Sequence, residues 1–175
     1  MKLRPLPVAL ALVTLLAPAA HATEYYIADP VVKNNMTIEP NYLTGIEMSR
    51  MPGGMPKGHD IIHLEVDVHA TPGETHGFAD HEWIPYLTVT YEIEKVGSRF
   101  KHKGHLYAMT AKDGPHYANN IAMDGPGKYA LIYHFEPPSK AGFIRHMDQA
   151  TGVPDWWEPF SLAWTFDYPG RAKAE

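Results

Sequence analysis

The sequence predicts an all-β protein, an immunoglobulin-like antiparallel β-sandwich of seven to nine strands. In several short stretches apolar residues alternate with polar ones. Successive side chains of a strand point to opposite faces, so each stretch can bury one face and expose the other. Clusters of Pro, Gly and Asp separate the stretches, and no stretch keeps a helical period for long. Antiparallel strands with one buried face pack as two layers.

Four stretches show this alternation most clearly. In the first, one face carries Ile62, Leu64, Val66 and Val68. We expect strong strands at residues 62–68, 87–93, 129–135 and 160–166. Weaker patterns predict further strands at residues 46–48, 99–109 and 117–122, and a short helix at residues 147–151 before a glycine.

Residues 1–22 predict a secretory signal peptide. Lys2 and Arg4 precede the apolar run 8–17, and Ala20-His21-Ala22 has the small residues of a cleavage site. The apolar run is shorter than the roughly 20 residues that span a bilayer. No later segment is long and apolar enough to insert. We therefore expect a soluble periplasmic protein, with residues 23–175 forming one metal-binding β-sandwich domain.

The composition narrows the function classes. The chain of 175 residues has no cysteine. That excludes disulfides, thiolate zinc sites, blue-copper sites and cysteine nucleophiles. The formal charge of −5 argues against a nucleic-acid partner, which calls for basic patches. The 11 histidines and 8 methionines are unusually many, and both residue types ligate metals.

The stretch "HLEVDVHA" raises the possibility of a metal site. Its polar side carries His63, Glu65, Asp67 and His69. Residues two apart on a strand point the same way, with Cα atoms about 7 Å apart, so His63 and Glu65 can reach one ion. A single histidine on such a face is more often simply solvated. Further ligands must therefore converge on this pair, and we expect Asp67 and His69 to face solvent.

A hairpin supplies two such ligands. Met109 closes one expected strand, Asp113-Gly114-Pro115 turns the chain, and His116 opens the next. The alternatives are that Met109 fills the core and that His116 is a turn residue. His146 lies on a loop between two strong strands and could complete the set.

The types of ligand favour copper. Imidazoles with a thioether suit copper, whereas imidazoles with a carboxylate suit iron, manganese or zinc. A site of His63, Met109, His116 and His146 thus favours copper and leaves room for a harder ion near Glu65. A second ligand for that ion could come from Glu47 or from a methionine of the loop 48–55.

The other histidines and the tryptophans have simpler interpretations. His69, His76 and His81 match no zinc motif, so we expect a solvated loop there. Trp156 and Trp157 are expected to anchor a packed loop. No motif for phosphate binding or hydrolysis occurs, and we expect no enzymatic activity.

Four stretches resemble the periplasmic high-affinity ferrous iron transport protein family. They are "GIEMSRMPGGMPKGHDIIHLEVDVHA", "IPYLTVTYEI", "MTAKDGPHYANNI" and "IYHFEPP". The resemblance implies a homodimer of immunoglobulin-like sandwiches that binds copper through His and Met. It implies work with an inner-membrane iron permease and periplasmic electron-transfer proteins in iron uptake.

The resemblance also implies which residues bind the metal. It places the copper ligands at His63, Met109, His116 and His146, and gives Glu65 a role in a second copper position or in handling iron. It further implies that one ligand crosses from the partner chain. Two alternatives stay open: a periplasmic copper chaperone or copper-resistance carrier, and a copper-dependent ferroxidase or ferric reductase.

Overall fold

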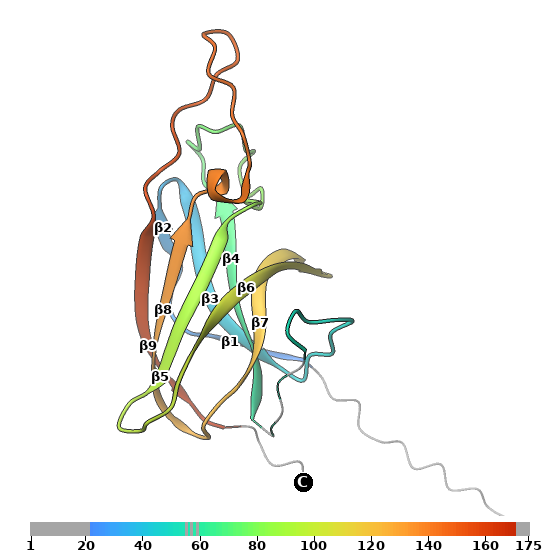
Figure 1. The fold of residues 1–175 in the computed structure, drawn as a ribbon, viewed down its shortest axis with the longest axis vertical. Helices are drawn as coiled ribbons and strands as arrows, with labels where there is room; N and C mark the ends of the chain where they lie inside the picture. The colour runs from blue at the N-terminus through green and yellow to red at the C-terminus, as the bar shows by residue number, and fades with distance from the viewer. Residues whose placement is uncertain (1–21, 55, 57, 59, 171–175) are drawn as a thin grey trace, which may run out of the picture.

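A computed structural model describes residues 22–54, 56, 58 and 60–170. The expected signal peptide lies outside these residues, apart from Ala22. The described residues form nine strands and one short 3-10 helix (Figure 1). They are β1 (Thr23–Tyr26), β2 (Val31–Lys33), β3 (Met36–Thr44), β4 (Ile61–Ala70), β5 (Thr88–Lys95), β6 (Lys101–Ala111), β7 (Gly114–Ala122), β8 (Gly127–Glu136), η1 (Pro138–Ala141) and β9 (Phe160–Tyr168).

All neighbouring strands are antiparallel, in the order β1-β3-β4-β7-β6-β5-β8-β9, with β2 also pairing with β3. Strand β6 belongs to both layers of the sandwich. Its first half, residues 101–106, pairs with β5, and its second half, residues 107–111, pairs with β7. The chain therefore passes from one layer to the other within a single strand, and the β6–β7 hairpin projects from the side of the sandwich (Figure 1).

The core lies between the two layers. Tyr42 of β3 contacts the rings of Phe166 and Tyr168 of β9, with each pair of ring centroids 5.8 Å apart. On β4, the even-numbered apolar residues that the alternation predicts to be buried are fully buried. The sequence-based prediction of an antiparallel all-β sandwich is confirmed, and the four strong strands are found as β4, β5, β8 and β9.

One strand prediction is wrong. Residues 46–48 form a loop, and the strand in this region is β3, which the sequence pattern did not reveal. Pro40 disguises it, because proline is unusual inside a sheet. The carbonyl of Pro40 accepts a hydrogen bond from the backbone N–H of Ile27, just after β1 ends and before β2 begins. The missing N–H of Pro40 thus falls where the outer neighbour strand is interrupted.

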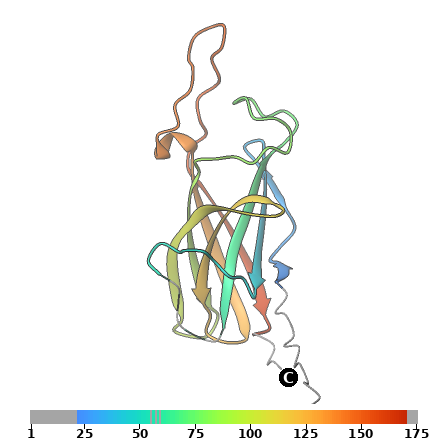
Figure 2. The same ribbon diagram turned by 90° about the vertical axis from the view of Figure 1, so that its right-hand side faces the viewer.

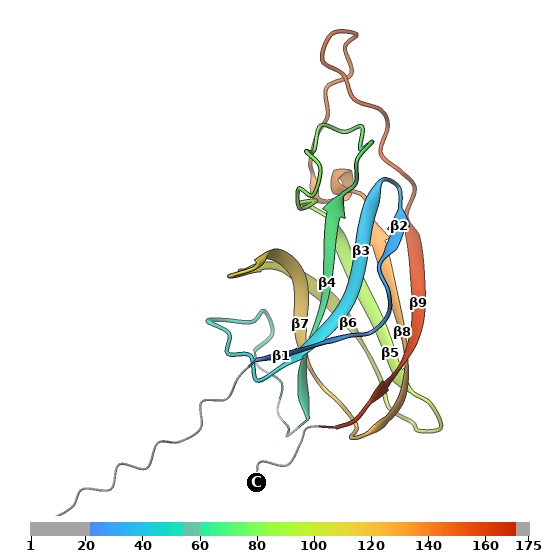
Figure 3. The same ribbon diagram turned by 180° about the vertical axis from the view of Figure 1, so that it is seen from behind.

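The expected helix at residues 147–151 is also absent. Asp148 accepts hydrogen bonds from the backbone N–H groups of Ala150 and Thr151, which closes a turn instead. This turn belongs to residues 142–159, here called the arm, which extends past one end of the sandwich (Figures 2 and 3). Among the described residues, no helix has the length and apolar character to cross a membrane.

The close packing of Gly104 against Tyr91 generates a stability prediction. The two residues are direct partners on β5 and β6, and a Cβ atom at position 104 would lie 2.9 Å from the hydroxyl of Tyr91. Because Tyr91 is buried, Gly104→Val should lower the free energy of unfolding by about 1–3 kcal/mol. Urea denaturation measures this. Ala108→Val, at an exposed position of the same strand, is the control, and equal effects would contradict the packing argument.

Candidate metal centre

Strand β4 carries the first two site residues. Its apolar side chains occupy one face, so the alternation places His63 and Glu65 together on the other face. Both are nevertheless buried, with 4% and 6% of their surface exposed. Polar side chains buried on the outer face of a sheet need neighbours that cover them, and β7 supplies these across the β4–β7 pairing.

The β6–β7 hairpin brings the next two residues. Met109 lies directly opposite His116 in the strand register, as expected for facing ends of a hairpin. His116 is buried and Met109 is half-buried. Because β7 pairs with β4, the hairpin sets His116 beside the β4 pair.

The ligand atoms of three residues converge. Glu65 Oε2 lies 3.6 Å from Nε2 of His63 and 3.4 Å from Nε2 of His116. The two imidazole rings stand nearly perpendicular at 88°, with centroids 5.8 Å apart. All three ligand atoms lie within 4.8 Å of one another, and among the described residues this is the one group of three or more His, Asp or Glu so placed. A single ion can therefore be reached by all three.

A cavity of about 590 Å³ opens over these atoms. It is also lined by Met109, by Asp113 of the hairpin turn, and by Glu47 and Met48 of the loop after β3. The expected contribution of Glu47 and a loop methionine thus has a place in the structure. Met51 is buried, and Met55 lies outside the described residues.

Asn120 orients His63. The two residues are direct partners on β4 and β7, and Nδ1 of His63 lies 2.5 Å from Oδ1 of Asn120. An amide oxygen only accepts hydrogen bonds, so Nδ1 carries the proton and Nε2 keeps the lone pair that a metal needs. Nε2 is also the atom that faces Glu65.

The buried groups are uncharged when no metal is bound. Burial lowers the pKa of His63 and of His116. Burial, followed by the negative charges of Asp67, Asp113 and nearby Glu24, raises the pKa of Glu65 to about 8. The close His–Glu contacts are therefore contacts of neutral groups. A metal ion would have to displace a proton from Glu65, whereas the imidazoles are already deprotonated at neutral pH.

Asp67 is not a solvated residue, contrary to the sequence-based expectation. It is half-buried, and it accepts a hydrogen bond of 2.8 Å from Nδ2 of the fully buried Asn41. Burial raises the pKa of Asp67. Sequence reasoning missed Asn41 and Asn120. Their only sequence signal is an amide in an alternating stretch, and it becomes meaningful only once the strand partners are known.

The structure does not bring His146 to this group within one chain. Its side chain is 76% exposed on the arm, and its Nδ1 bonds to the hydroxyl of Thr151. His146 is absent from the lining of the cavity and from the group of converging ligand atoms.

The second histidine cluster divides, and His69 is half-buried on β4, contrary to the expectation that it faces solvent. His81 is 87% exposed, as expected for a solvated loop. The side chain of His76 is only 9% exposed, so that expectation is wrong for His76. Its ring is stacked on Trp156 with centroids 4.4 Å apart, which agrees with the prediction that this tryptophan anchors a packed loop.

Comparisons with known proteins find similar chains. Residues 21–170 match the family model described as Fe2+ transport protein. A UPF0423 protein of Brucella abortus is 42% identical over 90% of this chain and 88% of its own length. The 34 kDa membrane antigen of Treponema pallidum is 33% identical over 74% of this chain and 66% of its own length.

Solved structures extend the comparison. FetP of uropathogenic Escherichia coli is 45% identical with a TM-score of 0.79, covering 86% of this chain and 99% of FetP. The copper-reconstituted P19 protein of Campylobacter jejuni is 40% identical with a TM-score of 0.76, again over 86% and 99%. A copper-bound Glu-to-Gln variant of FetP has also been solved. It is 44% identical, with a TM-score of 0.80, and the match covers 85% of this chain and 99% of the FetP chain.

The hydrogen bond of Asn120 generates one prediction. Asn120→Leu should weaken copper binding by about 10- to 100-fold, because the ring of His63 loses the partner that fixes its tautomer. Competition with a chromogenic copper chelator measures the affinity. Asn119→Leu is the matched control, since Asn119 bonds instead to the backbone carbonyl of His105. Equal affinities in the two variants would contradict the assignment.

The raised pKa of Glu65 generates a second prediction, for the metal-free protein. The unfolded chain releases this proton near pH 4.3 and the folded chain near pH 8, so stability is lost as the pH rises through this window. Thermal unfolding in a chelating buffer should show the melting temperature of the wild type falling from pH 5 to pH 8.5 relative to Glu65→Gln. Glu158→Gln, at an exposed position, should follow the wild type. Parallel curves for wild type and Glu65→Gln would refute the raised pKa.

Proposed function

The chain belongs to the Fe2+ transport protein family, and on that premise we propose that it is a periplasmic metal-binding protein of a high-affinity iron uptake system. It binds copper, and iron as cargo, at the centre built on β4 and the β6–β7 hairpin. The observation that carries this proposal is the buried convergence of two imidazoles and a carboxylate beside a thioether.

The donor set fits copper. Nε2 of His63, Nε2 of His116 and the sulfur of Met109 would hold it, because imidazole and thioether together suit both copper oxidation states. Bound copper would supply one-electron chemistry beside the iron cargo. Glu65 offers the hard oxygen that iron prefers, and Glu47 lines the same cavity. The copper-bound structures of P19 and of the FetP variant support this choice of metal.

A homodimer would complete the centre. The arm exposes His146 between Ile144 and Met147, which are 90% and 78% exposed. Apolar side chains exposed this far are typical of a surface that docks on another chain. We propose that His146 is the ligand that crosses to the centre of the partner protomer.

In the cell the protein would act as a binding component rather than an enzyme. The signal peptide would direct it to the periplasm, where an inner-membrane iron permease and electron-transfer proteins would be its partners. A copper carrier is the second candidate, favoured by Met48 at the same cavity as Met109. Growth of a deletion strain separates the two, because an iron-uptake role predicts a defect under iron limitation and a copper-carrier role predicts copper sensitivity.

The ligand assignment generates a further prediction. His116→Ala and Met109→Ala should each weaken copper binding by about 10- to 100-fold or more, and His116→Ala should fail to restore growth of the deletion strain under iron limitation. Copper affinity is measured by chelator competition. His105→Ala, an exposed histidine on the same hairpin, is the control. Affinities unchanged in both ligand variants would refute the assigned centre.

A further inference from the structure

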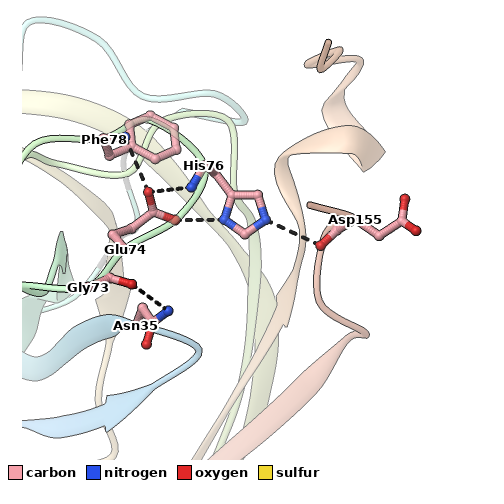
Figure 4. A network of polar contacts seen from close by, with 6 residues as sticks. All are labelled: Asn35, Gly73, Glu74, His76, Phe78 and Asp155. Atoms are coloured by element: carbon pink, nitrogen blue, oxygen red, sulfur yellow. Dashed lines mark hydrogen bonds and ion pairs between the residues drawn. The ribbon is translucent and has the colours of Figure 1, made fainter. Parts of the chain in front are cut away.

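The arm is tied to the loop 71–83 by His76, and Phe78 of this loop also stacks on Phe143 of the arm. His76 Nδ1 lies 2.6 Å from Oε1 of Glu74, and its Nε2 lies 3.3 Å from the backbone carbonyl oxygen of Asp155, 79 residues along the chain (Figure 4). The loop 71–83 is itself held to the sandwich, since Asn35 donates a hydrogen bond to the carbonyl of Gly73. The contact thus joins the arm to a fixed point.

The partners of His76 fix the position of its ring. A carboxylate and a carbonyl oxygen only accept hydrogen bonds, so each ring nitrogen of His76 faces an acceptor. Glu74 also accepts hydrogen bonds from the backbone N–H groups of His76 and Phe78. Burial alone would raise the pKa of Glu74, but these bonds together lower it, so Glu74 is ionised.

Trp156 covers the other side of the same ring. The indole and the imidazole are parallel within 7°, so the two rings stack face to face. We call Glu74, His76, Asp155 and Trp156 the clasp. His76 bonds to the backbone of Asp155 and stacks on Trp156, so one side chain holds two neighbouring residues of the arm.

The arm is braced beyond the clasp as well. Arg145 pairs with the carboxylate of Asp155 and donates to the carbonyl of Val153 at 3.0 Å. Phe143 stacks on Tyr86 with centroids 4.8 Å apart. Yet the arm exposes Ile144 and Met147 rather than burying them in its own core. These contacts hold the arm in place while its apolar side chains remain accessible at the surface.

We propose that Glu74 and His76 are positioning residues that hold the arm where His146 reaches the metal centre of the partner protomer. This inference rests on the proposed function, since it takes His146 to be the crossing ligand. It adds that the position of this ligand is set by the loop 71–83, which itself touches no metal. Loss of the clasp therefore frees the arm and weakens the fourth metal contact without altering His63, Met109 or His116.

The experiment compares four variants of the full copper-loaded protein. Hydrogen exchange reports the arm itself through the amide of Val153, which bonds to the carbonyl of His146. The electron paramagnetic resonance spectrum of Cu(II) reports the ligand set. His76→Ala should speed exchange of this amide about tenfold and shift the spectrum towards that of His146→Ala. Glu74→Gln, which keeps the size of the side chain but removes its charge, should move both in the same direction. His81→Asn, on the same loop but exposed, should match the wild type.

The outcomes separate the two proposals. A wild-type spectrum in His76→Ala together with a changed spectrum in His146→Ala overturns the positioning role and leaves the crossing ligand in place. A wild-type spectrum in His146→Ala overturns the crossing ligand, and the positioning role with it. Unchanged exchange in His76→Ala shows that the clasp does not hold the arm. Added imidazole should restore the wild-type spectrum in both histidine variants if an empty ligand position is their shared defect.

Discussion

The burial of Glu65 between two imidazoles is the constraint on which the metal centre depends. A carboxylate here is removed from water and surrounded by other acids, so the metal-free protein keeps it protonated. Such a group lowers the stability of the metal-free protein at neutral pH and is tolerated because the surrounding sheet holds it in place. Buried polar groups that violate the usual rules of packing are often found at functional sites. A bound cation would offset the unfavourable burial of the Glu65 carboxylate with a favourable electrostatic interaction.

The two faces of β4 are coupled through the sandwich. The face opposite the centre is core, and the hydroxyl of the fully buried Tyr133 donates a hydrogen bond of 3.1 Å to the backbone carbonyl of Glu65. Strand β8 of one layer therefore fixes the backbone of the site residue in the other layer. Asn120 of β7 holds the ring of His63, and Tyr133 of β8 holds the backbone of Glu65. Precision of the ligand geometry thus comes from sheet packing.

Much of this arrangement could be predicted from the sequence, and the failures have physical causes. Period-two alternation reveals strands that bury one face, and it revealed β4, β5, β8 and β9. It failed for β3, where Pro40 lies opposite the break between β1 and β2. The pairing of His63 with Glu65, and of Met109 with His116, follows from local geometry and was predictable. The roles of Asn41, Asn120 and His76 depend on partners far along the chain, which no local pattern specifies.

The β6–β7 hairpin and the pairing of β4 with β7 bear on the order in which the candidate ligands come together during folding. The β6–β7 hairpin joins residues that are close in sequence, so Met109 and His116 can meet within microseconds. His63 and Asn120 are 57 residues apart, and their meeting requires the slower long-range closure of β4 on β7. Until the sandwich closes, the chain therefore brings together only half of the ligand set. The convergence of the candidate ligands is therefore a property of the finished fold.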